Sequence, residues 1–283
     1  MAMSIANRFD VGSLLGRGSF GKVYECIDRN TGDLRAVKLE EITEGKFSQL
    51  TYEYRIYNEL GPLECVPRIY FFGVQGEYRC LVMDLLDRDL EDVRRSTPKG
   101  VIPIREIIRI GSLLIHHIRE IHSKGFLHRD LKPQNIMCCS DRVFLMDFGL
   151  AKKFVDGRSG VNMHVSYREN KKGLAGTPRY ASARTARGIQ QSRRDDIESL
   201  CYVLVYLATG ALPWVGLSRD ERAAGTALRL KESTTPGVIC QGLPDCICMM
   251  LTSALELEFD ERPPYERYVR AFKQGCDDEN IYI

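Results

Sequence analysis

The chain has 283 residues, of which 44% are hydrophobic and 28% are charged, and 40 Lys and Arg residues nearly balance 38 Asp and Glu. This composition excludes a disordered chain, and the length fits one large domain or two packed lobes. The net charge of +2 is too small to hold nucleic acid or an anionic membrane by its general field, so any basic function must be local and no nucleic-acid partner is expected.

The ten cysteines do not indicate a secreted disulfide framework, because the chain is large and no basic leader followed by an apolar stretch opens it. The spacings of Cys138 to Cys139 and of Cys246 to Cys248 differ from those of a structural zinc site. We expect buried, inert thiols in a reducing compartment, the cytoplasm or the nucleus. The longest apolar stretch, about 202–217, is broken by polar residues, Gly and Pro, so we expect no membrane insertion.

The first part of the chain, from Phe9 to about Met83, has the pattern of a small sheet. Alternating hydrophobic residues predict strands near 9–15, 23–27 and 34–39, with a hairpin turn at Asn30-Thr31-Gly32. One helix interrupts the strands, because hydrophobic residues recur there every three or four positions. This spacing leaves Glu53 to face inward or across. The residues of that stripe are Leu50, Tyr54, Tyr57 and Leu60.

After Asp84 the pattern changes to long helices. One amphipathic helix covers about 107–121, and a second, about 197–207, is hydrophobic on every side and is expected to be buried all round. We therefore predict an α+β fold with a small sheet-rich lobe over 1–86 and a larger helical lobe over 87–283, joined at residues 84–87. The chain contains no internal repeat, and its sequence carries no signal for an oligomeric state.

A glycine-rich motif, Gly16-Arg17-Gly18-Ser19-Phe20-Gly21, matches a pattern shared by dinucleotide sites, phosphate-binding flaps and chance loops. A dinucleotide site would need a helix directly after the glycines. Residues 22–27 are strand-like instead and lead to the hairpin turn. This order favours a strand, loop and strand that close over phosphates, where glycines let the backbone approach the oxygens; a plain glycine-rich hairpin is the alternative.

Lys38 stands in the otherwise apolar strand segment Ala36-Val37-Lys38. A buried ammonium is costly without anionic partners, and Glu53 on the following helix, together with a phosphate, could provide them. The alternative is a lone strand lysine that points into solvent.

The most specific stretch is His128-Arg129-Asp130-Leu131-Lys132-Pro133-Gln134-Asn135, which is followed by Asp147-Phe148-Gly149 across a predicted hairpin at Ser140-Asp141. In this pattern Asp130 orients the proton of an attacking hydroxyl, and Lys132 neutralises a transferred phosphoryl group. Asn135 and Asp147 supply hard oxygen ligands, which suit Mg²⁺. We interpret His128 as structural.

These four elements, in this order and spacing, resemble a eukaryotic protein kinase over about residues 9–275. Three further stretches are similar to the casein kinase 1 family, which also lacks the usual A-P-E motif. They are Tyr167-Arg168-Glu169-Asn170-Lys171, Gly176-Thr177-Pro178-Arg179-Tyr180-Ala181-Ser182 and Gln191-Ser192-Arg193-Arg194-Asp195-Asp196-Ile197-Glu198-Ser199-Leu200. The tau-tubulin and vaccinia-related kinases match less well.

The resemblance implies a bilobal protein kinase fold and a Ser/Thr kinase that transfers the γ-phosphoryl of ATP with Mg²⁺. It implies that Thr177 acts beside the catalytic residues Asp130 and Lys132, and that Asp196 anchors the catalytic loop. The residues that it implies for nucleotide binding are Leu15, Gly16, Gly18, Ser19, Gly21, Val23, Ala36, Lys38, Glu53, Met83, Asp84, Leu86 and Met137.

The family favours protein substrates rich in acidic or phosphorylated residues, which a basic patch would attract. Arg179 and Lys171 fall on the matching positions, with a solvated surface as the alternative for each. Arg193 and Arg194 are as well explained by structural ion pairs with the acidic residues after them. The lysine cluster that the family carries near 218–231 is replaced by Arg222-Ala223-Ala224-Gly225-Thr226-Ala227, which predicts weaker recognition of primed substrates.

Two alternative functions use the same fold or motif. A pseudokinase would bind nucleotide or act as a scaffold without catalysis, and a dinucleotide-dependent oxidoreductase would use the glycine motif. The intact set of Lys38, Asp130, Asn135 and Asp147 favours an active enzyme over the first, and the strand after the glycines argues against the second.

Overall fold

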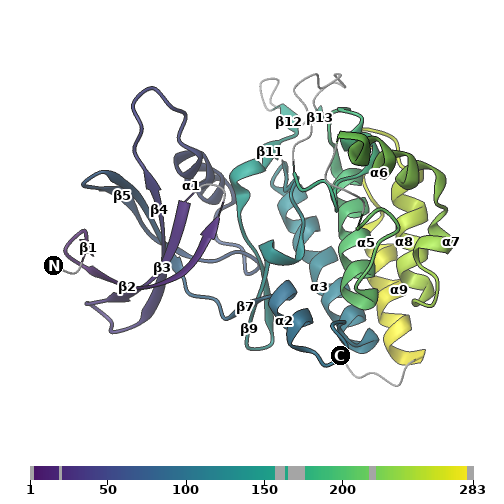
Figure 1. The fold of residues 1–283 in the computed structure, drawn as a ribbon, viewed down its shortest axis with the longest axis horizontal. Helices are drawn as coiled ribbons and strands as arrows, with labels where there is room; N and C mark the ends of the chain where they lie inside the picture. The colour runs from purple at the N-terminus through teal and green to yellow at the C-terminus, as the bar shows by residue number, and fades with distance from the viewer. Residues whose placement is uncertain (1–2, 19–20, 157–162, 165–175, 217–220, 279–283) are drawn as a thin grey trace. The chain divides into compact units, whose positions relative to one another are not determined.

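The structure is a computed structural model, and it describes residues 3–18, 21–156, 163–164, 176–216 and 221–278. The chain packs into two compact units, Met1–Asp87 with Cys138–Gly149, and Arg88–Met137 with Leu150–Ile283. The first is rich in strands and the second in helices (Figure 1), which confirms the predicted fold class. Residues 138–149 pack with the first unit, although their place in the sequence lies within the range expected for the helical lobe.

The first unit is built on a six-stranded sheet in the order β1-β2-β3-β4-β6-β5, in which every neighbouring pair is antiparallel. The predicted strands are present, and the hairpin turn at Asn30-Thr31-Gly32 joins β3 to β4. The strands of the sheet are β1 Ser4–Ile5, β2 Phe9–Gly18, β3 Gly21–Asp28, β4 Leu34–Glu41, β5 Ile69–Gln75 and β6 Tyr78–Asp84.

The two faces of β4 explain why a lysine stands in this strand. Successive side chains of a strand point to opposite faces. Val37 and Leu39 belong to the hydrophobic core on one face, together with Phe9 and Val82. Lys38 therefore points to the other face, where it meets a carboxylate of α1.

Helix α1, Gln49–Leu60, is the predicted helix of this unit. Its N-terminus is capped twice, because the Ser48 hydroxyl accepts a hydrogen bond from the Thr51 amide and Glu40 of β4 accepts bonds from the amides of Gln49 and Leu50. The glutamate fixes the start of α1 to the strand that carries Lys38.

The buried face of α1 differs in part from the predicted stripe. It comprises Leu50, Glu53, Ile56, Tyr57 and Leu60. Tyr54 is only partly buried and stacks on Phe72 of β5 with ring centroids 4.1 Å apart.

A short hairpin follows Gln134 and Asn135. Strands β9, Ile136–Cys139, and β10, Arg142–Leu145, turn at Ser140 and Asp141 as predicted, and the boundary between the two units falls within β9. The amide of Leu145 donates to the carbonyl of Cys65, which ties β10 to the rest of the first unit. A single 3₁₀ turn at Phe148–Leu150 comes next.

The second unit is a helical body with short strands. Its helices are α2 Leu90–Ser96, α3 Ile104–Ser123, α4 Ala183–Ala186, α5 Arg193–Thr209, α6 Glu221–Ser233, α7 Pro236–Ile239, α8 Asp245–Glu256 and α9 Tyr265–Asp278. Its shorter elements are β7 Arg88–Asp89, β8 Phe126–Leu127, a 3₁₀ turn at Pro133–Asn135, β11 Lys152–Lys153, β12 Val155–Asp156 and β13 Met163–His164.

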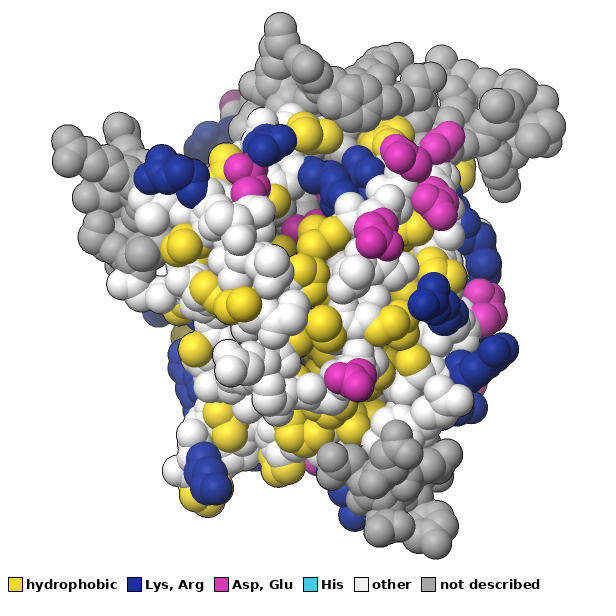
Figure 2. Space-filling view, turned by 90° about the vertical axis from the view of Figure 1, so that its right-hand side faces the viewer, with side chains coloured by type: hydrophobic (Ala, Val, Ile, Leu, Met, Phe, Trp, Pro, Cys, Tyr) yellow, Lys and Arg dark blue, Asp and Glu magenta, His cyan; other side chains and the backbone are white. Residues whose placement is uncertain are grey.

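Helix α5 packs against α3 and α8 in the second unit, and α9 packs against both of these helices. Residues 200–207 are buried without interruption, as its sequence predicts for a helix with no solvent face. Burial of each large apolar side chain stabilises the fold by roughly 1.5–3 kcal/mol. On the face of this unit that Figure 2 shows, hydrophobic side chains form a central band and charged side chains lie mainly around its edges.

The nine cysteines whose side chains the structure describes are all free thiols. Six are buried, and Cys138, Cys139 and Cys248 are partly buried. The expectation of buried, unpaired thiols is therefore confirmed for most of them.

Candidate active site

The glycine-rich loop joins β2 to β3, with Gly16 opposite Val23 and Gly18 opposite Gly21 in the register of the two strands. A strand follows the glycines, as the sequence predicts for a phosphate-binding flap. Gly21 has a φ of 148°, and a Cβ at this position would lie 2.2 Å from the carbonyl oxygen of Leu39, so a larger residue would push β3 away from β4. Ser19 lies outside the described residues.

Lys38 of β4 lies in a partly buried triad with two carboxylates of the first unit, of which Glu53 is buried. Its Nζ is 2.7 Å from Oε2 of Glu53 and 3.6 Å from Oδ1 of Asp147. Burial alone would lower the pKa of Lys38, but the two carboxylates reverse this effect and raise that pKa. Burial raises the pKa of Glu53, and Lys38 opposes the rise. The ammonium therefore stays charged at neutral pH.

Asp147 is held in place by the residues that follow it. Its φ is 62°, in the left-handed region, and Phe148 packs fully buried against Tyr57 of α1, edge to face with ring centroids 5.2 Å apart. The side chain of Gln49 donates to the carbonyl of Gly149. Because Glu53 lies on the same helix, α1 positions both carboxylates around Lys38.

The second unit carries the catalytic-loop residues, and they converge on Asp130. Its Oδ2 accepts a bond of 2.7 Å from Nζ of Lys132, and its Oδ1 accepts bonds from the amide and hydroxyl of Thr177 at 2.8 Å and 2.7 Å. The amide nitrogen of Asn135 donates to the carbonyl and to Oδ2 of Asp130. Burial alone would raise the pKa of Asp130, but Lys132 and Thr177 lower it below its usual range, so Asp130 is an ionised carboxylate.

Gly176 allows the approach of Thr177 to Asp130. It has a φ of 102°, and a Cβ on this residue would lie 2.5 Å from the carbonyl oxygen of Arg129. Any side chain at this position would therefore separate the Thr177 hydroxyl from the catalytic loop.

Asp196, at the start of α5, binds the backbone of the catalytic loop. Its carboxylate accepts bonds from the amides of His128 and Arg129 and from the imidazole of His122. His128 is buried, and its Nδ1 lies 3.3 Å from the amide of Asp130, which fits the structural role expected for this residue. These contacts fix the backbone that carries Asp130.

A family model described as the protein kinase domain matches residues 9–263, nearly the whole chain. The chain belongs to the protein kinase family. Protein kinases bind ATP and transfer its phosphoryl group to protein substrates, so the dinucleotide-dependent oxidoreductase is excluded.

Of the residues predicted to bind the nucleotide, all but Met137 belong to the first unit. Ala36 and Met83 are register partners in β4 and β6, and both are buried, whereas Val23 on β3 is partly buried. The backbone at Asp84 is fixed, because its carboxylate accepts bonds from the Arg68 amide and the Tyr70 hydroxyl.

Leu86 is buried and Leu15 is half exposed, both in the first unit. Met137 belongs to the second unit. Its part in nucleotide binding therefore stays a prediction.

Two residues of the kinase have oxygen atoms suited to a divalent cation. Among the described residues, Oδ1 of Asp147 is buried and accepts no hydrogen bond, and a metal ion would satisfy it. The side-chain nitrogen of Asn135 donates hydrogen bonds to Asp130, so its side-chain oxygen remains for a metal. The donor set thus fits Mg²⁺. Because Asn135 and Asp147 belong to different units, the binding of one ion by both residues stays a prediction.

Of the two substrate-binding residues predicted for the kinase, Arg179 is exposed and Lys171 lies outside the described residues. The Arg179 guanidinium lies 5.3 Å from the ring centre of Tyr206 on α5, a cation–π contact that orients it.

Arg193 and Arg194 make structural contacts, and the charge of Asp195 acts on Arg194. Their guanidinium groups donate to the backbone carbonyls of Asp260 and Leu257.

Several residues that shape this kinase site have no local signal in the sequence. Glu40 caps α1, and Gln191 binds the guanidinium of Arg129 at 2.5 Å. His122 links Asp196 to Tyr265 of α9, a residue 143 positions further along the chain.

Within the part of the chain that the structure describes, none of the helices has the length and hydrophobicity needed to span a membrane.

Proposed function

We propose that this kinase phosphorylates Ser and Thr residues, that it uses Mg²⁺-ATP, and that it is of the casein kinase 1 type, with a preference for acidic or phosphate-primed protein substrates. The three casein kinase 1-like stretches of the sequence support the subfamily. The one at 176–182 and the one at 191–200 carry the contacts described above, and the one at 167–171 lies outside the described residues.

The observation that carries the proposal is the arrangement around Asp130. Lys132 and the Thr177 hydroxyl lie 2.7 Å from different oxygens of its carboxylate. A hydroxyl group must come within hydrogen-bond reach of that carboxylate to be phosphorylated. Lys132 and Thr177 bind this carboxylate from either side, and this arrangement, together with the casein kinase 1-like stretches, supports transfer to Ser and Thr.

Each residue then has a defined part in the transfer. Ionised Asp130 accepts a bond from the substrate hydroxyl and orients it, and Lys132 lies where it can neutralise charge on the transferred group. Lys38, oriented by Glu53, aligns the nucleotide phosphates. Asp147 and Asn135 would hold Mg²⁺, which supplies charge neutralisation when bound.

The expected substrate preference depends on Arg179, an exposed residue two positions after Thr177. A guanidinium can bind a phosphate or carboxylate with two parallel hydrogen bonds. The first residues of α6 carry no lysine, and Gly225 and Ala227 offer no charge to a substrate. We therefore expect the priming preference to rest mainly on Arg179.

The proposal is tested with purified protein, ATP labelled on the γ-phosphate, Mg²⁺ and casein, followed by phosphoamino-acid analysis. Three matched acidic peptides that differ only in a single Ser, Thr or Tyr are the second substrate set. Label on Ser and Thr, lost when EDTA removes the metal, is the expected result. Label on Tyr alone would contradict the Ser/Thr assignment, and ATP binding without any transfer would identify a pseudokinase.

A further inference from the structure

The segment that carries Arg179 is held by side chains from outside it. The carbonyl of Arg179 accepts a bond of 2.8 Å from Nε1 of Trp214. The carbonyls of Pro178 and Ala181 both accept bonds from Nζ of Lys231 on α6, the first at 2.8 Å. Two side chains therefore fix three carbonyl groups: that of Arg179 itself, one before it and one after it.

Lys231 itself is buried, with 5% of its surface exposed. Its partners are backbone carbonyls, and its ammonium lies 5.1 Å and 5.5 Å from the ring centres of Trp214 and Tyr202. Burial lowers the pKa of Lys231 to about 8, and the charge of Glu198 opposes the shift. An ammonium in such surroundings is costly for the fold. It also cannot reach a substrate, because it is enclosed.

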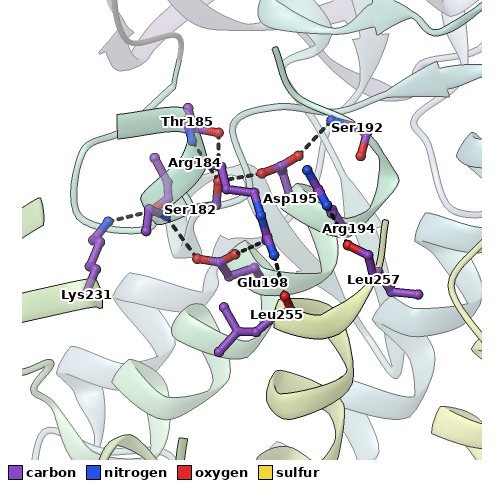
Figure 3. A network of polar contacts seen from close by, with 12 residues as sticks. Ser182, Arg184, Thr185, Ser192, Arg194, Asp195, Glu198, Lys231, Leu255 and Leu257 are labelled. Atoms are coloured by element: carbon purple, nitrogen blue, oxygen red, sulfur yellow. Dashed lines mark hydrogen bonds and ion pairs between the residues drawn. The ribbon is translucent and has the colours of Figure 1, made fainter. Parts of the chain in front are cut away.

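The two ends of the segment are fixed separately. At one end Thr177 binds Asp130. At the other end the Ser182 hydroxyl, which caps α4, donates to buried Asp195 at 2.5 Å, and buried Glu198 accepts a bond from the amide of Ala183 (Figure 3). Lys231 and Trp214 act between these anchors, in addition to the bonds from the amides of Tyr180 and Ala181 to the carbonyl of Thr177.

We propose that Lys231, together with Trp214, is a positioning residue for the protein substrate. By holding the carbonyls on both sides of Arg179, the two side chains set the direction in which its guanidinium meets an acidic or phosphorylated residue. Lys231 is the last residue of the 218–231 stretch. Because its ammonium is enclosed and binds backbone carbonyls, its role differs from the direct binding of a substrate anion. This inference rests on the proposed function.

The test compares Lys231→Met, Trp214→Phe and Arg229→Met as a control. Arg229 lies exposed on the same helix and binds the Thr226 hydroxyl. Trp214→Phe keeps an aromatic ring near Tyr202 but removes the donor to Arg179. For each variant, KM for a primed peptide and its unphosphorylated twin, KM for ATP, kcat and the thermal unfolding midpoint are measured.

We expect Lys231→Met to raise KM for the primed peptide about tenfold and to reduce the preference for it, because a small misplacement of a binding group is costly. Trp214→Phe should give the same change to a smaller extent, and the double variant should change less than the product of the two. KM for ATP should stay within about twofold, and Arg229→Met should match the wild type.

A lower unfolding midpoint with unchanged peptide KM in folded Lys231→Met would make Lys231 merely structural and overturn the inference. If that variant does not fold, unchanged peptide KM and unchanged primed preference in Trp214→Phe would overturn it equally. Failure of the proposed function would look different, because the wild type itself would then not phosphorylate either peptide.

Discussion

His122 and Asp196 share a hydrogen bond of 2.8 Å in the interior of the second unit, from Nε2 of the imidazole to Oδ2 of the carboxylate. The other ring nitrogen, Nδ1, lies 2.6 Å from the hydroxyl of Tyr265. A neutral imidazole satisfies both contacts, with Nε2–H donating to Asp196 and the tyrosine hydroxyl donating to Nδ1. Since Asp196 also holds the catalytic loop, the protonation of His122 is coupled to the structure of the active site.

Acid is expected to destabilise the protein through His122. Burial lowers the pKa of this imidazole below its usual 6.5, and Asp196 only partly opposes the shift. The unfolded chain takes up a proton near pH 6.5 whereas the folded chain does not, so the free energy of unfolding falls as the pH drops below 6.5, with a slope of up to about 1.4 kcal/mol per pH unit from this group.

Urea unfolding at several pH values between 7.5 and 5 measures this slope. His122→Gln keeps one donor and one acceptor but does not titrate, so it should lose that part of the pH dependence. The same slope in both proteins would show that His122 does not titrate differently on folding.

Lys38→Met should lower kcat on the order of 10²–10³-fold, because the ammonium that aligns phosphate charge is lost. The variant also leaves Glu53 buried without its cation, so the thermal unfolding midpoint is measured in parallel. Lys46→Met changes an exposed lysine of the same unit and should behave like the wild type. An unaltered rate in Lys38→Met would indicate a pocket in which another lysine serves the phosphates.

The kinase should be active without phosphorylation of its activation segment. The guanidinium of Arg129 is the group that an activating phosphate would bind, and here it donates to Gln191 at 2.5 Å and to the carbonyl of Leu150 at 3.3 Å. Protein made in bacteria and treated with a phosphatase should therefore phosphorylate casein at the same rate as untreated protein. Strict dependence on an upstream kinase would refute this expectation.

Arg179→Ala should remove most of the preference for a phosphorylated peptide over its unphosphorylated twin. A partly exposed charge contact contributes roughly 1 kcal/mol, or about fivefold in apparent affinity, and weakens as salt increases. The comparison is the ratio of kcat/KM for the two peptides, with Arg187→Ala as a control because this exposed arginine pairs with Glu232. Equal ratios in the wild type and in Arg179→Ala would exclude Arg179 as the residue that binds the phosphate.

The sequence predicts those parts of the molecule that depend on local patterns. Alternating residues predict β2 to β4, the glycine motif and the strand after it predict the phosphate-binding flap, and the His128–Asn135 stretch predicts the residues around Asp130. These features follow from spacing along the chain, because strand alternation and loop motifs are short-range.

Contacts between distant residues could not be predicted in the same way. The Lys231 ammonium binds a carbonyl 53 positions away, and Gln191 binds Arg129 across 62 positions. Nothing in the neighbouring sequence distinguishes these polar residues from solvated ones. The partner of a buried polar group is set by the tertiary fold. The same reason explains why the hydrogen bonds of Arg193 and Arg194 to the carbonyls of Asp260 and Leu257 could not be predicted.

The most direct test of the central claim is the rate of phosphoryl transfer in Asp130→Asn, measured in a single turnover with saturating ATP and Mg²⁺. The change removes the ionised carboxylate with almost no change in volume, so circular dichroism and ATP affinity should match the wild type. We predict that the rate falls by a factor on the order of 10²–10⁴, the usual size of a general-base effect. A variant that retains half of the wild-type rate would contradict the assignment of Asp130 as the residue that orients the substrate hydroxyl.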